Sequence, residues 1–242
     1  MLIKLLQKTA LVTGILSTAT VSLAHPLLSS SGLQISLEFP PPPDRPGLES
    51  SAGGGTRSGS EGLASGCTQG EIPLTALAPV GSEAETTVSA RPDFFLYIPA
   101  TTATAAEFVL IDQMGNDVYT NDLEIPNAPG ILQVALPDNI TLEEGETYTW
   151  QMAVICDPNN PSGDEYVEGK IERIPLSDEL KTQVEATNEP LKQAELYAQQ
   201  RIWQDTLMLM AQVRDSNPTA WTQLLESVGL EAIASVPVIQ DY

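Results

Sequence analysis

The clearest alternation of apolar and polar positions runs through residues 147–156. One face of this repeat carries Tyr148, Trp150, Met152, Val154 and Cys156, whereas the other carries Thr147, Thr149, Gln151, Ala153 and Ile155. A period of two with one apolar face is typical of a β-strand that buries that face. We therefore predict a long strand here, with its first set of side chains in the core.

Shorter stretches of the same kind precede and follow this strand. They predict strands at residues 72–78, 86–90, 94–99, 107–113, 117–122, 131–136 and 166–174. Their spacing and the turn residues between them are typical of a sandwich of antiparallel strands. Pro92 and Pro99 bracket the apolar 94–97 run, which indicates an edge strand or strand ends. We expect a mainly β fold with seven or eight antiparallel strands, resembling the immunoglobulin or fibronectin type III sandwich.

The turn before the long strand carries a recognisable spacing. Leu142, Gly145 and Tyr148 lie three residues apart. This spacing resembles a tyrosine corner, in which a tyrosine near the start of a strand bonds back to the preceding turn. We predict a structural role for these three residues.

The pattern changes to a helical period after residue 176. Ser177 can cap a helix that extends to about Ala186, and Asn188 with Pro190 can start a second helix that runs to about Val213. A third helix follows Asn217-Pro218 and ends at Gly229, and a short fourth helix is expected at residues 230–235. Residues 197–218 look like one tetratricopeptide-type hairpin, which needs the sandwich or a partner to cover it. The fold class is thus a β-sandwich followed by a small C-terminal α-helical bundle.

The N-terminal quarter has a different composition. Residues 1–24 combine Lys4 and Lys8, an apolar run and the small residues Ser22 and Ala24, which predicts a secretory signal peptide cleaved after Ala24. Residues 25–66 are rich in Pro and Gly and predict a linker, although apolar positions at 33–39 alternate and can form a short strand or dock on the main domain. The sandwich then spans 67–175 and the helical region 176–242. No later stretch is apolar enough to cross a bilayer.

Charge narrows the choice of partners. The chain has 32 acidic and 11 basic residues, with a formal net charge of −21. A field of this sign repels the phosphates of nucleic acids and anionic lipid headgroups. We therefore expect neither nucleic acid nor a membrane surface as partner.

The two cysteines, Cys67 and Cys156, form an even and low count for an exported chain. We predict one disulfide between them, closing a loop of about 90 residues, which in the chain-entropy account stabilises the fold by roughly 4–5 kcal/mol. Zinc ligation by two lone cysteines is a poor alternative, because a third Cys or an ordered His is lacking. We predict no metal and no cofactor.

Catalytic constellations are weak in this sequence. The only histidine, His25, lies at the predicted new N-terminus, so a nucleophilic triad has no base in a domain. The Gly53-Gly54-Gly55-Thr56-Arg57 segment lacks the Lys-Ser/Thr that a phosphate-binding loop needs. Paired carboxylates such as Glu143 and Glu144 lie in turns, where solvated surface is the simpler interpretation.

An acidic loop at residues 157–165 is a candidate calcium ligand set. It offers Asp157, Asn159, Asn160, Asp164 and Glu165. Pro161 occupies a ligand position of the EF-hand pattern, and flanking helices are not expected. A solvated loop is therefore the favoured interpretation.

Several motifs together resemble a known family. They are Arg45 in the Pro-rich segment, the 53–57 Gly run, Cys67, the segments 73–77, 94–99 and 107–110, Gly145 with Tyr148 and Trp150, Cys156, Gly169 with Ile171 and Arg173, and Ile202-Trp203. The chain resembles the cyanobacterial family catalogued as domain of unknown function 928 over nearly the whole mature chain. Residues 58–65 make a longer join than the family's usual one. The resemblance implies export and a domain type but no mechanism.

These observations lead to an ordered set of functional hypotheses. The first is an exported envelope protein, periplasmic or extracellular, that acts without catalysis as a protein-interaction or structural module with another envelope protein as partner. The second is carbohydrate or cell-wall polysaccharide binding, and the third is a carboxylate-dependent hydrolase. Few aromatic residues and their positions on predicted buried faces place the second below the first.

Overall fold

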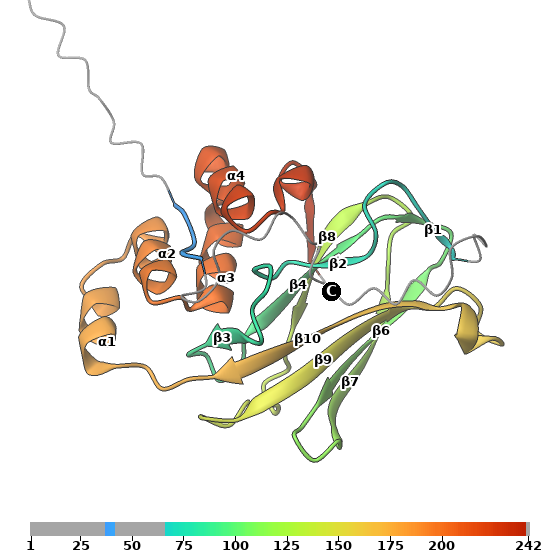
Figure 1. Cartoon of the computed structure of the whole chain (residues 1–242), viewed down its shortest axis with the longest axis horizontal. Coiled ribbons are helices and arrows are strands. Elements are labelled where there is room, and N and C mark those ends of the chain that lie inside the picture. Colours follow the sequence, from blue (N-terminus) through green and yellow to red (C-terminus); the bar gives the residue numbers. More distant parts are fainter. Residues whose placement is uncertain (1–36, 42–65, 241–242) are drawn as a thin grey trace, which may run out of the picture. The chain divides into compact units, whose positions relative to one another are not determined.

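The computed structural model describes residues 37–41 and 66–240 (Figure 1). The predicted signal peptide, most of the predicted linker, His25 and the 53–57 Gly run lie outside these residues. The strands are β1 (Thr68–Gln69), β2 (Thr75–Ala76), β3 (Glu85–Thr87), β4 (Asp93–Ile98), β5 (Ala100–Thr101), β6 (Ala105–Ile111), β7 (Asp117–Glu124), β8 (Gly130–Ala135), β9 (Thr147–Val154), β10 (Glu165–Arg173) and β11 (Val238–Gln240). The helices are α1 (Asp178–Glu185), α2 (Pro190–Gln199), α3 (Trp203–Val213) and α4 (Pro218–Ser227), with short 3-10 turns at Pro161–Gly163 and Glu231–Ile233.

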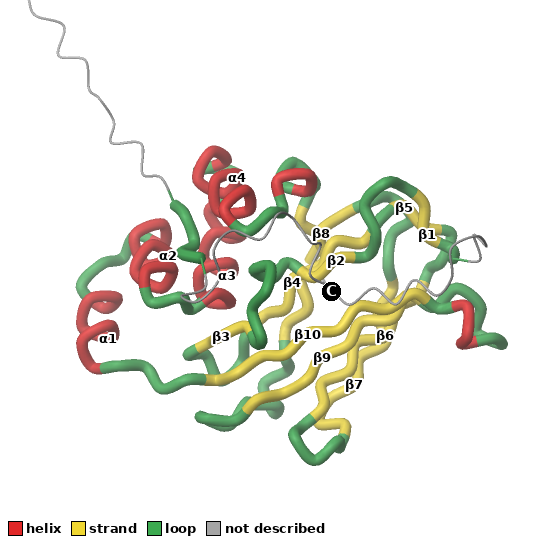
Figure 2. Tube along the Cα trace, viewed as in Figure 1, coloured by secondary structure: helices red, strands yellow, loops and turns green. Residues whose placement is uncertain are grey.

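Two sheets pack face to face around the larger core. A five-stranded sheet has the order β3-β10-β9-β6-β7, a four-stranded sheet has the order β11-β8-β4-β2, and β1 pairs with β5. The alternation predicted at residues 147–156 is present in β9, where Tyr148, Trp150, Met152 and Val154 are all buried in the core between the sheets. The mainly β architecture with C-terminal helices is therefore confirmed (Figure 2).

A second core lies on the far face of the four-stranded sheet. In β4, Phe94, Leu96 and Ile98 belong to the core between the sheets, whereas Phe95 and Tyr97 belong to a cluster with side chains of α2, α3 and α4. A strand buried on both faces needs a continuous apolar run, which is what the 94–98 segment supplies. The edge-strand interpretation of this segment was wrong, since β4 lies between β2 and β8. Its prolines mark the strand ends.

The short segment at residues 37–41 also joins the second core. Leu37 and Phe39 are buried there, and the Phe39 ring meets the Trp203 ring edge-on at 4.9 Å. The Phe39 amide donates a hydrogen bond to Ser227 Oγ at 2.9 Å. Of the two options for the alternating 33–39 stretch, its described end docks on the helices without forming a strand.

The sheets are mixed, which corrects the purely antiparallel expectation. β3 pairs with β10 in parallel, and β11 pairs with β8 in parallel. β11 was not predicted, because three residues are too few to show an alternation, and β3 and β2 are shorter than the predicted strands. Both parallel strands lie at sheet edges, where the chain crosses between layers.

The single helix predicted from Pro190 to Val213 is two helices. Arg201 takes a positive φ of 62°, its amide donates to Ala198 O, and the Ile202 amide donates to Tyr197 O. These two bonds form a Schellman motif, which ends α2. The break went unpredicted because glycine usually holds this position. The cap of α2 is Glu189 in place of Asn188, and residues 230–235 form only a 3-10 turn.

Candidate functional site

Two buried carboxylates lie where β3 meets α3. Glu85 is only 5% exposed and accepts hydrogen bonds from Trp150 Nε1 at 3.3 Å and from Gln204 Nε2. Burial raises the pKa of the Glu85 carboxyl to about 8, and the bond from Trp150 offsets part of that rise. Glu85 is therefore mostly protonated at neutral pH. Gln204 Oε1 on the same side chain is buried and accepts no hydrogen bond in the described part of the chain.

Asp205 is the second buried carboxylate. It accepts hydrogen bonds from Thr87 Oγ1 at 2.8 Å and from the Val88 amide at 3.0 Å. Burial raises the pKa of Asp205, and these two bonds oppose the rise. Each carboxylate thus accepts a hydrogen bond from across the junction, Glu85 from Gln204 of α3 and Asp205 from Thr87 of β3, and these bonds fix α3 against β3.

Two further bonds cross the same junction. Trp203 Nε1 donates to Leu77 O at 2.7 Å, and Thr86 Oγ1 donates to Arg201 O at 2.6 Å. The αL turn at Arg201 therefore serves a purpose: it turns the carbonyl of that residue toward β3. We refer to Glu85, Thr87, Trp203, Gln204 and Asp205 as the polar junction. Sequence reasoning missed it, although three successive polar residues, 204–206, are its signal in a helix whose other residues are apolar except Gln212.

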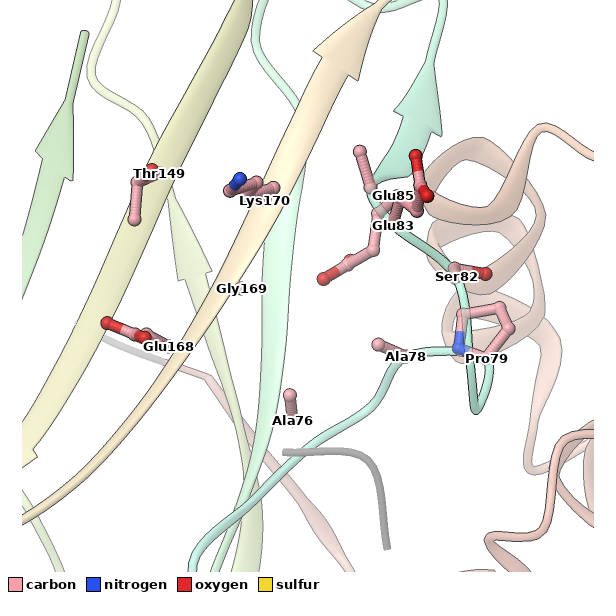
Figure 3. A pocket seen from close by; sticks show the side chains of 11 residues that line it. Ala76, Ala78, Pro79, Ser82, Glu83, Glu85, Thr149, Glu168, Gly169 and Lys170 are labelled. Atoms are coloured by element: carbon pink, nitrogen blue, oxygen red, sulfur yellow. The ribbon is translucent and has the colours of Figure 1, made fainter. Parts of the chain in front are cut away.

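A pocket of about 240 Å³ opens beside the polar junction. Its lining consists of Ala76, Ala78, Pro79, Ser82, Glu83, Ala84, Glu85, Thr149, Glu168, Gly169 and Lys170 (Figure 3). Residues 168–170 of β10 form one wall, and the connection between β2 and β3 forms the other. Glu85 is thus the one pocket residue that also belongs to the polar junction.

The outer face of the five-stranded sheet is acidic. Because Val167 and Ile171 of β10 are fully buried, Glu168, Lys170 and Glu172 point to the opposite face. Glu107 of β6 and Asp122 of β7 lie directly opposite each other on the same face, since their neighbours Phe108 and Leu123 are buried. We call this the acidic face: Glu107, Asp122, Glu124, Glu168 and Glu172, with Lys170 as its basic member.

The two cysteines are brought together. Cys67 and Cys156 have their sulfur atoms 2.10 Å apart and their Cα atoms 5.3 Å apart, which is disulfide geometry. The Glu165 carboxylate lies beside them and accepts hydrogen bonds from the amide and hydroxyl of Thr68. Sulfurs bonded to each other lack the thiolate charge that a metal ligand needs. The pair therefore ties the entry of the sandwich to the end of β9.

The predicted corner residues also meet. Tyr148 Oη accepts a hydrogen bond from the Glu143 amide at 3.0 Å, Leu142 is fully buried, and Gly145 has a φ of +84°. Arg173 adds a bond to Leu142 O at 2.6 Å that the sequence did not suggest. The turn is thereby fastened to the ends of both β9 and β10.

The acidic loop at residues 157–165 uses its oxygens internally. Asp164 Oδ1 accepts from the Cys156 amide at 2.8 Å, and Asp157 Oδ1 accepts from the Asn159 amide at 2.9 Å. Within residues 37–41 and 66–240, the potential ligand cluster that includes a residue of this loop is Cys67, Cys156 and Glu165, whose sulfurs form the disulfide. The loop carboxylates thus act as turn-forming acceptors.

The fold and these contacts define the class of protein: a disulfide-bridged β-sandwich with a helical layer on one sheet. The chain belongs to the family described as Domain of Unknown Function (DUF928), whose family model matches residues 52–238. This confirms the resemblance drawn from the motifs. The comparison with curated proteins returned no match. No helix in the described part is both long and apolar enough to span a bilayer.

Proposed function

We propose that this protein is an exported, non-catalytic interaction module of the cell envelope, and that its acidic face binds a basic segment of a partner protein. The observation that carries the proposal is the unequal covering of the two sheets. Both faces of the four-stranded sheet are buried, whereas the outer face of the five-stranded sheet carries half-exposed and exposed side chains along β6, β7, β9 and β10.

The chemistry of this face selects the partner. Five carboxylates and one lysine give it a negative field, and the chain as a whole has a formal net charge of −21. Charge of one sign speeds the encounter with a partner of the opposite sign and excludes partners of the same sign. A Lys- or Arg-rich protein segment is the partner that fits.

Compartment and fold type are part of the proposal. The signal-like residues 1–24 and the cysteine pair support an oxidising location outside the cytoplasm, periplasmic or extracellular. We place the sandwich with the immunoglobulin-like architectures, on the strength of its two packed sheets and the turn that Tyr148 fastens. In this account the helical layer and the disulfide hold the acidic face rigid.

The test measures binding of a decalysine peptide by titration calorimetry at rising salt. We expect saturable binding that weakens between about 0.02 and 0.3 M salt. The variant Glu107→Lys with Asp122→Lys reverses two neighbouring charges and should weaken binding about tenfold. The matched control, Glu185→Lys with Glu226→Lys, makes the same charge change on exposed positions of α1 and α4 and should change it little. Equal losses in both variants would contradict a face-specific site.

Carbohydrate binding is the second candidate, and one observation favours it. Tyr166 of β10 is 36% exposed on the acidic face, where its ring can stack on a sugar. The three tryptophans, the side chains that sugar sites use most readily, are all buried. An array of wall polysaccharides separates the two candidates, because sugar binding that Tyr166→Ala abolishes would reverse their order.

A further inference from the structure

β10 is paired over only part of one edge. The strand spans nine residues, and β9 pairs with eight of them, from Glu165 to Glu172. On the other edge, β3 pairs only with Ile171, Glu172 and Arg173. Within the described residues, the 166–170 part of this edge has no partner strand, and residues 168–170 of it line the pocket.

The register shows which backbone groups point to that edge. The Arg173 amide bonds to Glu146 O, on the β9 side, whereas the next amide, that of Ile174, bonds to Thr87 O on the β3 side. Backbone groups of successive residues alternate between the two edges of a strand. The N–H and C=O groups of Glu168 and Lys170 therefore point away from β9, toward the pocket.

Small residues keep this edge accessible. Position 169 requires a glycine, because a Cβ there would lie 2.5 Å from Cζ2 of Trp150. Across the pocket, three of the lining residues are the alanines Ala76, Ala78 and Ala84. Figure 3 shows the 78–84 connection bending away from β10 before β3 begins. The space thus continues the line of β3 along β10.

The size and charge of the space indicate its occupant. A volume of about 240 Å³ equals roughly eight water molecules, which suits one side chain or a very short extended segment. Glu83 and Glu168 lie on opposite sides of Gly169, and both are exposed. Lys170 offsets one of these charges, and Glu85 offers a buried carboxyl that is held by Trp150 and Gln204. The Glu168 carboxylate accepts a hydrogen bond from Gln151 Nε2 of β9 at 3.2 Å, and together with Glu83 it gives the pocket rim a negative charge that a basic side chain complements.

We propose that the free edge of β10 at residues 168–170 binds an extended segment of the partner as an added strand in line with β3. The segment bonds to the backbone of Glu168 and Lys170 and places a Lys or Arg side chain between Glu83 and Glu168. This inference rests on the proposed function, because the side chains of Glu168 and Lys170 belong to the acidic face. Strand addition of this kind draws its affinity from main-chain bonds and its specificity from side-chain pockets.

The experiment follows hydrogen exchange of assigned backbone amides by NMR in the full mature chain. The peptide is acetyl-TVKVT-amide, compared with acetyl-TVQVT-amide and with the first peptide N-methylated at the amides that face β10. We expect the unmodified peptide to slow exchange of the Glu168 and Lys170 amides about fivefold or more. The Gln peptide and the variant Glu83→Gln should each bind about fivefold more weakly. The matched variant Glu144→Gln, at an exposed turn, should bind as the wild type does.

The outcomes separate this inference from the proposed function. If the methylated peptide binds as well as the unmodified one, or if exchange at Glu168 and Lys170 is unchanged at saturation, strand addition is wrong. Strand addition is also wrong if the peptide does not bind while decalysine still distinguishes the two charge-reversal variants. In that case the acidic face binds basic segments without the β10 edge. Loss of decalysine discrimination with retained protection of the two amides overturns the proposed function and leaves the β10 site.

Discussion

The core between the two sheets and the junction between β3 and α3 solve different problems. The first is made of apolar side chains closed by a disulfide, and the second holds two buried carboxylates among hydrogen-bond donors. An apolar core contributes a free energy of unfolding that does not depend on pH, whereas a buried carboxyl makes the free energy of unfolding depend on pH. The sandwich core therefore supplies stability, and the polar junction sets the pH range in which the helices stay attached to the sandwich.

The largest expected effect comes from opening the apolar core. Phe108 is fully buried and its ring packs 4.9 Å from that of Phe94. We expect Phe108→Ala to lower the free energy of unfolding by about 3–5 kcal/mol, through lost burial and the cavity left behind. Urea unfolding measures the loss. It should be the same at pH 5.5 and pH 8.5, and a loss confined to one pH would break the contrast between core and junction.

Removing the disulfide should have the next largest effect. The bond joins positions 89 residues apart in the sequence. We expect Cys67→Ser with Cys156→Ser to lower the free energy of unfolding by about 2–4 kcal/mol, because the unfolded chain regains freedom. This range is below the roughly 4–5 kcal/mol of the chain-entropy account, since residual structure in the unfolded state reduces the entropy that the bond removes. Reduction of the wild type by a dithiol should give a similar midpoint shift. An unchanged midpoint in both experiments would mean that the bridge does not stabilise the sandwich.

The polar junction predicts a dependence of stability on pH. The folded state raises the pKa of Glu85 to about 8 from 4.5, so folding favours its protonated form. This contribution is fully present below pH 4.5 and is lost as the pH rises through 8. We therefore expect wild-type stability to fall between pH 5.5 and 8.5, by on the order of 2 kcal/mol, and the raised pKa of Asp205 acts in the same direction.

The variant Glu85→Gln tests the origin of this slope. Glutamine has the shape of a protonated glutamate, so the variant should unfold like the wild type at pH 5.5 and at higher urea than the wild type at pH 8.5. The control is Glu83→Gln, which neutralises an exposed carboxylate two residues away. A slope that Glu83→Gln flattens and Glu85→Gln leaves intact would assign the pH dependence to surface repulsion.

The smallest effect is expected at the turn before β9. Tyr148→Phe removes the hydroxyl that accepts from the Glu143 amide and leaves the ring in place. We expect a loss of about 1 kcal/mol, the net contribution of one hydrogen bond, at both pH values. Thermal unfolding followed by circular dichroism is sensitive enough to detect it. A loss above that of the disulfide variant would reverse the ranking of the two elements.

Sequence patterns predicted the elements whose signal lies in long repeats. β9 alternates over eight residues and β4 is an apolar run after Asp93, so both were found, and so was α4 between Pro218 and the Gly229 cap. The break at Arg201 and the strand β11 were missed, since tertiary contacts hold an arginine in a glycine conformation and three residues carry no period.

The candidate sites were less predictable than the fold. Cysteine count and the Leu142, Gly145 and Tyr148 spacing pointed to contacts that the structure contains. Glu85 and Asp205 were not singled out, because nothing in the residue type separates a buried carboxylate from the many exposed ones in an acidic chain. Their burial depends on how β3 and α3 meet, which is decided by segments more than 100 residues apart in the sequence.

The parallel pairing of β11 with β8 anchors the C-terminal end of the helical layer to the four-stranded sheet. The helices follow β10 of the five-stranded sheet and precede β11 of the four-stranded sheet. The helical layer is therefore connected to one sheet at its start and to the other sheet at its end. Detaching the helices from the sheet by force or proteolysis requires breaking the pairing of β11 with β8. It would expose Phe95 and Tyr97 of β4 to solvent. The helices therefore form an anchored cover of the four-stranded sheet, and their loss would leave an apolar sheet face that is prone to aggregation.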